Sequence, residues 1–268
     1  MKISNMYLLN DRSTFRIYGN ETFEFLQSLI TANITPLKEN KAIASCLLSA
    51  QGRIIYDFLL YPEGNDEFSC VVDCHYLEKE DLIKKINMYK LRSDVKIEED
   101  INLNVAASAS KDTYFIIDPR HKDMPYRYLI HKNNKNLLKD KDSEYLKSRL
   151  KLCISEGPKE IPRGEALPLD FWMDKTNQVS FNKGCFIGQE VTARVFHRNK
   201  IRRRLIVVEF NEIDFDNQNL PKNFKFINKI GAYLLLLAPI DFIKEFEEIN
   251  IKSQIELYDK KYNFHYYN

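Results

Sequence analysis

The chain has 268 residues, a formal charge of +2 and 44% hydrophobic residues. That length is enough for one large domain or two unequal ones with a proper core, and the near-neutral charge gives no sign of a polyanionic partner. The five cysteines have no repeated spacing, which argues against a disulfide framework and suits a reducing compartment.

The predicted elements, in chain order, mix antiparallel strands with helices. Residues 14–18 predict a strand that ends at Gly19, and Asn20 is expected to cap a helix whose apolar residues recur at helical spacing up to Ile30. Gly52 lies in the turn of a predicted hairpin. In the first 130 residues the predicted strands are residues 14–18, 42–49, 53–61, 67–73, 95–97, 103–107, 114–117 and 126–130. The later predicted helices are residues 77–91 and 143–154, with a polar loop at residues 132–142 between them.

From residue 155 to residue 178 no periodic pattern is visible. A connection of this length in a compact domain usually has a function. Residues 205–210 then predict a new strand, and the polar residues 211–222 are suited to joining two domains. Without regular β-α-β alternation the pattern predicts an α+β layered fold. We place a domain boundary between residues 1–204 and 205–268, the second unit being small and partly helical from Asp241 onward.

The densest signal is the octapeptide from Lys183 to Glu190. Its two glycines, Gly184 and Gly188, bracket Cys185, and glycine is used where φ is positive or the backbone passes close to another group. The residues after Gly188 predict a short helix. Cys185 would then lie near the unpaired N–H groups of a helix start, with Lys183 beside it, and both features favour a thiolate. A buried structural cysteine is the alternative interpretation.

Other candidate chemistry in the sequence is weaker. Cys70, Cys74 and His75 suggest a metal site, but the two cysteines alternate on one strand face, which is typical of a buried strand. Cys46 and Cys153 also fall at apolar-patterned positions. His197 would be about 13 Å along the helix axis from the helix start, so we expect a solvated side chain and not a base for Cys185. We therefore predict no firm metal site.

Residues 198–204 form the strongest local run of positive charge. Such a run binds phosphates, the glutamate tail of a folate or an acidic protein surface, or is simply solvated. Because no RNA-binding module accompanies it, nucleic acid is the least favoured partner.

The octapeptide Lys-Gly-Cys-Phe-x-Gly-Gln-Glu resembles the K-G-C-[YF]-x-G-Q-E motif of the YgfZ family, folate-binding proteins implicated in iron–sulfur cluster assembly. The flanking matches are similar to the branch that contains the mitochondrial [4Fe–4S] assembly factor, and together they cover about a fifth of the chain. They include Arg149, Glu156–Gly157, Glu160–Pro162, Gly164, Ala166–Leu169, Val179–Phe181, Thr192–Arg194, His197 and Ile201–Leu205.

The resemblance extends more distantly to the aminomethyltransferases of the glycine cleavage system. It implies their folate-binding fold with a small C-terminal β-barrel-like domain, and tetrahydrofolate as a cofactor. In those enzymes an Asp pair follows the hairpin glycine; here Tyr56 stands in place of one carboxylate and Asp57 remains. Two tryptophans linked to folate in bacterial family members align with Arg12 and Arg149. The expected folate contacts are therefore Arg12, Asp57 and Arg149.

The function that the resemblance implies is assembly or repair of iron–sulfur clusters. Cys185 is the expected reactive residue and transient cluster ligand, because thiolates are the usual ligands of such clusters. The expected supporting residues are Lys183, Gly184, Phe186, Gly188, Gln189, Glu190 and Arg194, with Glu190 and Arg194 paired along the helix. A folate and an iron–sulfur carrier or scaffold protein are the expected partners. The alternatives are a tetrahydrofolate-dependent one-carbon (aminomethyl) transferase and a non-catalytic adaptor.

Overall fold

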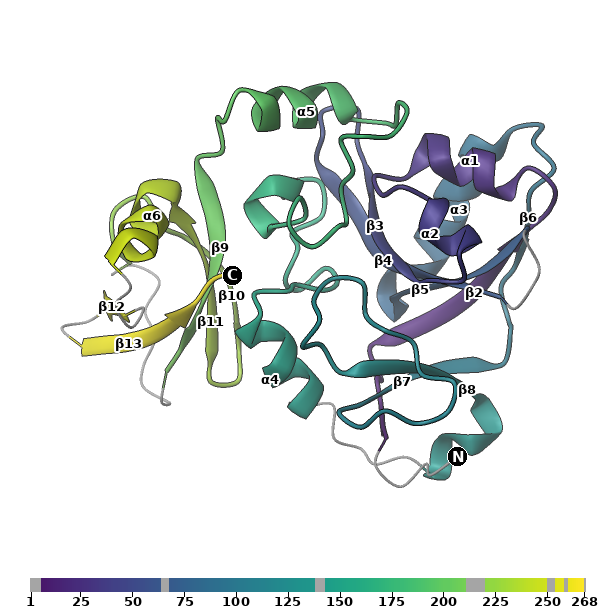
Figure 1. Cartoon of the computed structure of the whole chain (residues 1–268), viewed down its shortest axis with the longest axis horizontal. Coiled ribbons are helices and arrows are strands. Elements are labelled where there is room, and N and C mark those ends of the chain that lie inside the picture. Colours follow the sequence, from purple (N-terminus) through teal and green to yellow (C-terminus); the bar gives the residue numbers. More distant parts are fainter. Residues whose placement is uncertain are drawn as a thin grey trace.

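The computed structural model describes residues 6–63, 68–137, 143–210, 220–249, 254–257 and 260–267. Three antiparallel sheets and a set of short helices make up this part of the chain (Figure 1). The strands are β1 Tyr7–Leu8, β2 Arg12–Tyr18, β3 Ile43–Leu48, β4 Ile54–Pro62, β5 Ser69–His75, β6 Lys96–Glu98, β7 Leu103–Ser108, β8 Tyr126–His131, β9 Arg203–Glu209, β10 Lys225–Ile230, β11 Tyr233–Pro239, β12 Gln254–Leu257 and β13 Lys260–His265. The α-helices are α1 Thr22–Leu29, α2 Thr35–Lys38, α3 Lys79–Lys90, α4 Ser143–Lys151, α5 Gln189–His197 and α6 Ile240–Ile249, and 3-10 turns lie at Tyr76–Glu78, Lys132–Leu137 and Pro168–Phe171.

The N-terminal sheet has the order β3-β4-β5-β2-β6, and α1 and α3 cover one of its faces (Figure 1). The strands are buried on both faces, because Phe15, Phe58 and Val72 pack under those helices while their neighbours turn toward the centre of the molecule. Helix α3 contributes Leu82, Ile83 and Ile86 as its buried stripe, at the spacing that the sequence predicts. The hairpin around Gly52 is confirmed by the antiparallel β3–β4 pairing.

Two further sheets complete the fold. Strands β1, β7 and β8 form a three-stranded sheet, and β10-β11-β9-β13-β12 forms a five-stranded sheet at the C-terminal end, with α6 against it. Within the described residues the edge strands of this second sheet, β10 and β12, do not pair with each other. The predicted domain boundary falls inside β9, and the boundary itself stays a prediction.

The long connection after α4 lies between the N-terminal and C-terminal sheets (Figure 1). It contributes Phe171, Trp172 and Phe186 to one core that also holds residues of the β3–β4 hairpin and of β9. The indole N–H of Trp172 donates to the carbonyl of Leu205 at 2.8 Å. This connection therefore joins the two sheets through buried side chains, and it carries the octapeptide.

The sequence predictions for residues 114–117 and for Asn20 are wrong. Residues 114–117 are not a strand; a single bridge pairs Ile116 with Arg127, and Tyr114 has a φ of +63°, which is incompatible with an extended strand. Asn20 does not cap α1: its side chain donates to Asp94, and the residue before the helix is Glu21. Parts of three predicted segments, residues 67, 138–142 and 211–219, lie outside the described residues.

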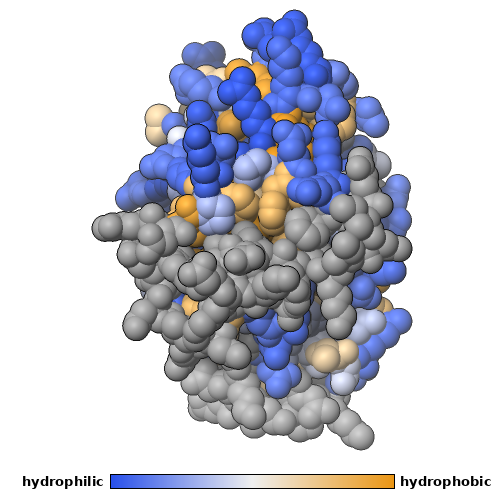
Figure 2. Space-filling view, turned by 90° about the vertical axis from the view of Figure 1, so that its left-hand side faces the viewer, coloured by the Kyte–Doolittle hydropathy of each residue, from blue (hydrophilic) through white to orange (hydrophobic). Residues whose placement is uncertain are grey.

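The surface on the side of the C-terminal sheet is mostly hydrophilic where it is described, and apolar residues gather in a smaller area between hydrophilic ones (Figure 2). No helix in the described part of the chain has both the length and the apolar character needed to cross a bilayer.

Candidate functional site

The octapeptide is fixed to the β3–β4 turn by a close contact between backbones. Gly188 has a φ of +80°, and a Cβ on it would lie 2.4 Å from the carbonyl oxygen of Ser49. Gly52 faces it from the turn, where a Cβ would lie 3.3 Å from the Gly188 oxygen. Both demands that glycine satisfies, a positive φ and a close approach, are thus met at Gly188.

Neither a positive φ nor a close backbone contact explains the glycine at position 184. A Cβ on Gly184 would meet no atom within 4 Å, and its φ is not positive. The prediction that the backbone requires glycine at this position is therefore wrong; the space around Gly184 is open.

Two neighbouring side chains after Cys185 anchor the segment in different cores. Phe186 is buried in the core shared with the C-terminal sheet, and Ile187 packs against the core beneath α1 and α3. Lys183 secures the other side, because its Nζ donates to the carbonyls of Ile30 at 2.6 Å and Ala32 at 2.9 Å. Cys185 is thus held between anchored residues while its own side chain is exposed.

The ammonium group of Lys183 is committed to these carbonyls and to the ring of Phe186, whose centroid is 5.3 Å away. Burial lowers the pKa of Lys183 to about 8. The sequence places Lys183 beside the thiol as an activating charge; in the structure its described contacts make it an anchor of the loop.

Cys185 differs from the other four cysteines in its exposure. Those four are buried, in accordance with their apolar sequence pattern, and Cys70 and Cys74 lie within the N-terminal core. Burial raises the pKa of each buried thiol, to about 12 for three of them, so they are poor nucleophiles and ligands at neutral pH. The buried set is Cys46, Cys70, Cys74 and Cys153.

Helix α5 begins directly after Gly188, as predicted. Glu190 and Arg194 form the expected ion pair at 2.6 Å, and both side chains are exposed. Gln189 is half-buried, and its backbone N–H donates a hydrogen bond to the Phe186 carbonyl. His197 lies at the opposite end of the helix, exposed and in contact with aromatic rings. The geometry gives it no role as a base for Cys185.

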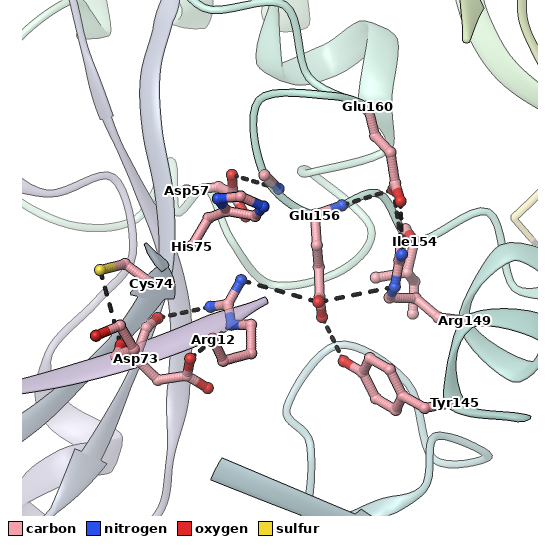
Figure 3. Close-up of polar contacts among 12 residues, drawn as sticks. Arg12, Asp57, Asp73, Cys74, His75, Tyr145, Arg149, Ile154, Glu156 and Glu160 are labelled. Atoms are coloured by element: carbon pink, nitrogen blue, oxygen red, sulfur yellow. Dashed lines mark hydrogen bonds and ion pairs between the residues drawn. The ribbon is translucent and has the colours of Figure 1, made fainter. Parts of the chain in front are cut away.

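The three predicted folate contacts come from distant parts of the sequence and converge on the turn at Glu156–Gly157 (Figure 3). Arg12 Nη1 lies 3.8 Å and Arg149 Nε 3.7 Å from the same carboxylate oxygen of Glu156. Asp57 accepts a hydrogen bond from the backbone N–H of Gly157 at 3.0 Å.

Both guanidinium groups are also bound to other carboxylates. Arg12 donates to Asp73 at 2.6 Å, and Arg149 donates to Glu160 at 2.6 Å and to the carbonyl of Ile154 at 2.7 Å. These groups are buried, which makes them parts of one internal charge network (Figure 3).

The sequence did not reveal the rest of this network. Glu156 is surrounded by guanidinium groups, with Arg120 and Arg127 each 2.6 Å from its carboxylate. Although burial alone would raise the pKa of Glu156, these cations hold it well below its usual value. The sequence feature that could have indicated the network is a charged residue inside an otherwise apolar strand, such as Arg127 in β8 or Asp73 in β5.

Four buried polar atoms at or near this turn have no hydrogen-bond partner among the described residues. Arg12 Nη1 and Arg149 Nε both point toward Glu156, and Ser155 Oγ and Glu78 Oε2 are the other two. Burial raises the pKa of Asp57 to about 6 and that of Glu78 to about 8. Buried donors and acceptors that lack a hydrogen bond are costly, so the region is suited to a polar guest.

Tyr56 lies on the other face of β4. Its ring packs in the core under α1 and α3, and Arg163 donates to its hydroxyl and lies over its ring. The Tyr56 side chain therefore lies on the opposite face of β4 from Asp57 and Glu156.

No protein-family model matches the chain. The human mitochondrial iron–sulfur cluster assembly factor IBA57 is 31% identical to it, over 76% of this chain and 66% of the relative. The mouse protein is 32% identical over 76% and 65%, and the homologue from Pyricularia oryzae 31% over 74% and 55%. The chain thus spans between about half and two thirds of these relatives.

Among solved structures, the glycine cleavage system aminomethyltransferase T from Bartonella henselae superposes with a TM-score of 0.68. The match covers 99% of this chain and 86% of that one at 11% sequence identity, so it concerns the fold. The octapeptide, the relatives and the fold agree: the chain is similar in sequence to the IBA57 iron–sulfur cluster assembly factors, and it has an aminomethyltransferase-like fold.

Proposed function

We propose that this protein takes part in the assembly or repair of iron–sulfur clusters and that Cys185 is the residue that does so. The observation that carries the proposal is the contrast among the five cysteines: one thiol is exposed and held between two anchors, while four are sealed in the core. An exposed thiol of this kind is suited to ligate iron or a cluster edge transiently. The names of the relatives support the same role.

The partner in this proposal is an iron–sulfur carrier or scaffold protein that brings further thiolate ligands. Cys185 alone is one ligand, whereas clusters are held by several thiolates. The open space at Gly184 leaves room for a partner chain to approach beside the thiol.

The test is to mix the purified chain with a cluster-loaded iron–sulfur carrier and to follow the visible absorption and circular dichroism of the cluster. We expect a new spectrum with the wild type and none with Cys185→Ser, whose oxygen is a poor ligand for iron. Cys153→Ser is unsuitable as a control, because that thiol is buried and donates to the carbonyl of His265. Lys200→Met, which alters an exposed side chain after α5, is the matched control. If Cys185→Ser gives the same new spectrum as the wild type, the thiol does not take part in cluster binding.

Tetrahydrofolate is the cofactor in this proposal, and the buried network offers polar groups that suit it. Arg12 Nη1 and Arg149 Nε, which make no hydrogen bond in the described residues, would donate to its polar atoms, and Asp57, whose pKa burial raises to about 6, would accept or hold a proton on it. When bound, the folate supplies the capacity to carry one-carbon units. The aminomethyltransferase-like fold supports this assignment.

A melting experiment tests the folate assignment, because a ligand that binds the native state raises the melting temperature by mass action. We expect an upward shift at saturating tetrahydrofolate and a smaller one in Arg149→Ala. No shift in the wild type removes folate from the account and leaves the Cys185 proposal standing.

A one-carbon transferase is the second candidate, favoured by the position of Asp57: its carboxylate accepts a hydrogen bond from Gly157 inside the network, and burial raises its pKa to about 6. Release of formaldehyde from an aminomethylated donor in the presence of tetrahydrofolate, lost in Asp57→Asn, would establish it. If no turnover occurs with folate bound, the chain is not an aminomethyltransferase.

For location we propose a reducing compartment, the mitochondrial matrix in a eukaryote or the cytoplasm in a bacterium. All five cysteines are free, and the relatives are named as mitochondrial. Fractionation of the source cells with an antibody to this chain decides between them.

A further inference from the structure

A hollow lies between the tip of the β3–β4 hairpin and helix α3. Its volume is about 540 Å³, which is within the range of small binding sites. Four segments line it: residues 48–50 at the end of β3 and in the turn, Ile55 in β4, two side chains of α3, and residues 163–164 of the long connection. The residues proposed to hold folate do not line this hollow, so it is a separate feature of the surface.

The charged side chains that line the hollow are both cations. They are Lys85 and Arg163, and none of the eight lining residues is acidic. Lys85 makes no ion pair among the described residues. Arg163 contacts Asp81 at 3.2 Å, but Lys84 lies 3.9 Å from the same carboxylate and shares its charge. The hollow therefore has an excess of positive charge that an anionic guest would complement.

Aromatic rings hold both cations in position. The Nζ of Lys85 lies 5.2 Å from the centroid of the Tyr89 ring. The guanidinium of Arg163 lies 4.3 Å from the centroid of the Tyr56 ring and donates to the Tyr56 hydroxyl, while its side chain stays 42% exposed. Cations that are already held in place lose little conformational freedom when a guest binds, which favours binding.

Apolar groups make up much of the remaining lining. Leu48 is buried, and Ile55 and Tyr89 are half-buried beside it. One side is open, because a Cβ on Gly164 would meet no atom within 4 Å. Nucleic acids bind mainly through many phosphate contacts, for which two cations are few. Apolar groups next to two cations instead suit a protein segment in which carboxylates flank an apolar side chain.

The hollow shares a wall with the segment that carries Cys185. Leu48 and Ser49 line the hollow, and a Cβ on Gly188 would lie 2.4 Å from the Ser49 carbonyl oxygen and 3.0 Å from the Leu48 Cβ. The hairpin tip accordingly lies next to the start of α5 (Figure 1). Cys185 precedes Gly188 by three residues, a span of at most about 11 Å. A protein with a segment in the hollow would therefore be within reach of the thiol.

We propose that this hollow is the docking site for an acidic segment of a protein partner. An apolar side chain of the segment packs against Leu48, Ile55 and the Tyr89 ring, and carboxylates on either side of it pair with Lys85 and Arg163. This site rests on the proposed function in one respect, because the partner is the carrier or scaffold protein whose cluster reaches Cys185.

The first experiment measures the fluorescence anisotropy of a rhodamine-labelled peptide, Glu-Asp-Phe-Glu-Asp, titrated with the full chain. We expect saturable binding that weakens as sodium chloride is added, because salt screens exposed charges. The matched peptides Gln-Asn-Phe-Gln-Asn and Glu-Asp-Ala-Glu-Asp, which lack the carboxylates and the ring respectively, should bind more weakly.

Variants of the lining residues locate the binding. Ala50 lines the hollow and is exposed, so Ala50→Glu and Ala50→Gln add side chains of equal size that differ by one charge. Ala50→Glu should bind the peptide about fivefold more weakly than Ala50→Gln, the upper end of the effect of one exposed charge pair. Lys85→Met should bind about threefold more weakly than the wild type. Lys84→Met, on the same helix but outside the hollow, is the control and should bind as the wild type does.

Equal binding by Ala50→Glu and Ala50→Gln overturns the proposal, and so does equal binding by Lys85→Met and the wild type. A labelled uridine dodecamer that binds more tightly than the peptide and displaces it also overturns the proposal, because the surface would then be a nucleic-acid site.

A second experiment separates failure of this site from failure of the proposed function. With a cluster-loaded carrier, Ala50→Glu should form the new cluster spectrum more slowly than Ala50→Gln and reach the same final amplitude, because charge at an interface mainly changes the association rate. Equal rates overturn the docking site and leave the role of Cys185 intact. If the peptide results hold but the wild type forms no spectrum, the cluster role of Cys185 fails and the docking site stands.

Discussion

Replacing Lys183 by methionine tests how the Cys185 segment is held. The change keeps an unbranched apolar stem and removes the ammonium group that donates to the carbonyls of Ile30 and Ala32. Hydrogen bonds to charged groups contribute about 1.5–3 kcal/mol each, and the contact with the Phe186 ring about 0.5–1 kcal/mol. The ammonium is only partly buried, and methionine relieves its desolvation, which opposes these gains.

The net loss is therefore about 2 kcal/mol, which corresponds to a decrease in melting temperature of about 4–8 °C for a chain of this size. If the loss is local, the backbone amides of residues 183–188 should exchange with solvent about 30-fold faster, since 1.36 kcal/mol is a factor of ten. Hydrogen–deuterium exchange with mass spectrometry measures this, and Lys200→Met, an exposed lysine, is the control. Unchanged melting and unchanged exchange in Lys183→Met would refute the anchoring role.

Three further predictions follow from the same geometry. Gly188→Ala should lower the free energy of unfolding in urea by about 2 kcal/mol or more, because it combines a positive φ with a contact at 2.4 Å, whereas Gly184→Ala should change it by less than about 0.5 kcal/mol; equal effects would contradict the docked turn. The native state holds the proton of Asp57 more tightly than the unfolded chain does, so stability is lost as the pH rises from about 4 through 6. Asp57→Asn should therefore be more stable than the wild type by about 3 kcal/mol at pH 7.5 and nearly equal in stability at pH 4. A stability difference that does not change with pH would exclude this titration. Iodoacetamide at neutral pH should label Cys185 first by mass spectrometry, and faster labelling of any other thiol would contradict the burial of Cys46, Cys70, Cys74 and Cys153.

The sequence predicts much of the fold because local patterns and the hydrophobic core agree in those elements. The start of α5 at Gly188 and the stripe of α3 depend on spacing within one segment, and the structure has both. The strand expected at residues 114–117 fails for the opposite reason: its apolar residues border a cavity, and a positive φ at Tyr114 breaks the extended chain.

The candidate site is less accessible from sequence, because its parts meet only in three dimensions. Arg12, Asp57 and Arg149 are brought together by the turn at Glu156–Gly157, which has no periodic pattern. Whether a charged residue in a strand faces solvent or a buried partner depends on pairings across the chain, such as that of Arg12 with Asp73, 61 residues apart. The anchoring role of Lys183 was hidden in the same way, since its acceptors lie about 150 residues earlier.

The central claim is that the exposed thiol of Cys185 supports iron–sulfur proteins. Its most direct test is to supply Cys185→Ser to cells that lack the wild-type chain and to measure the activity of their [4Fe–4S] enzymes, with the melting temperature of the purified variant as the check on folding. An exposed residue contributes little to packing, so the variant should melt within about 2 °C of the wild type and yet fail to restore enzyme activity. Full restoration by Cys185→Ser would contradict the account and leave the chain as an adaptor whose cysteine is dispensable.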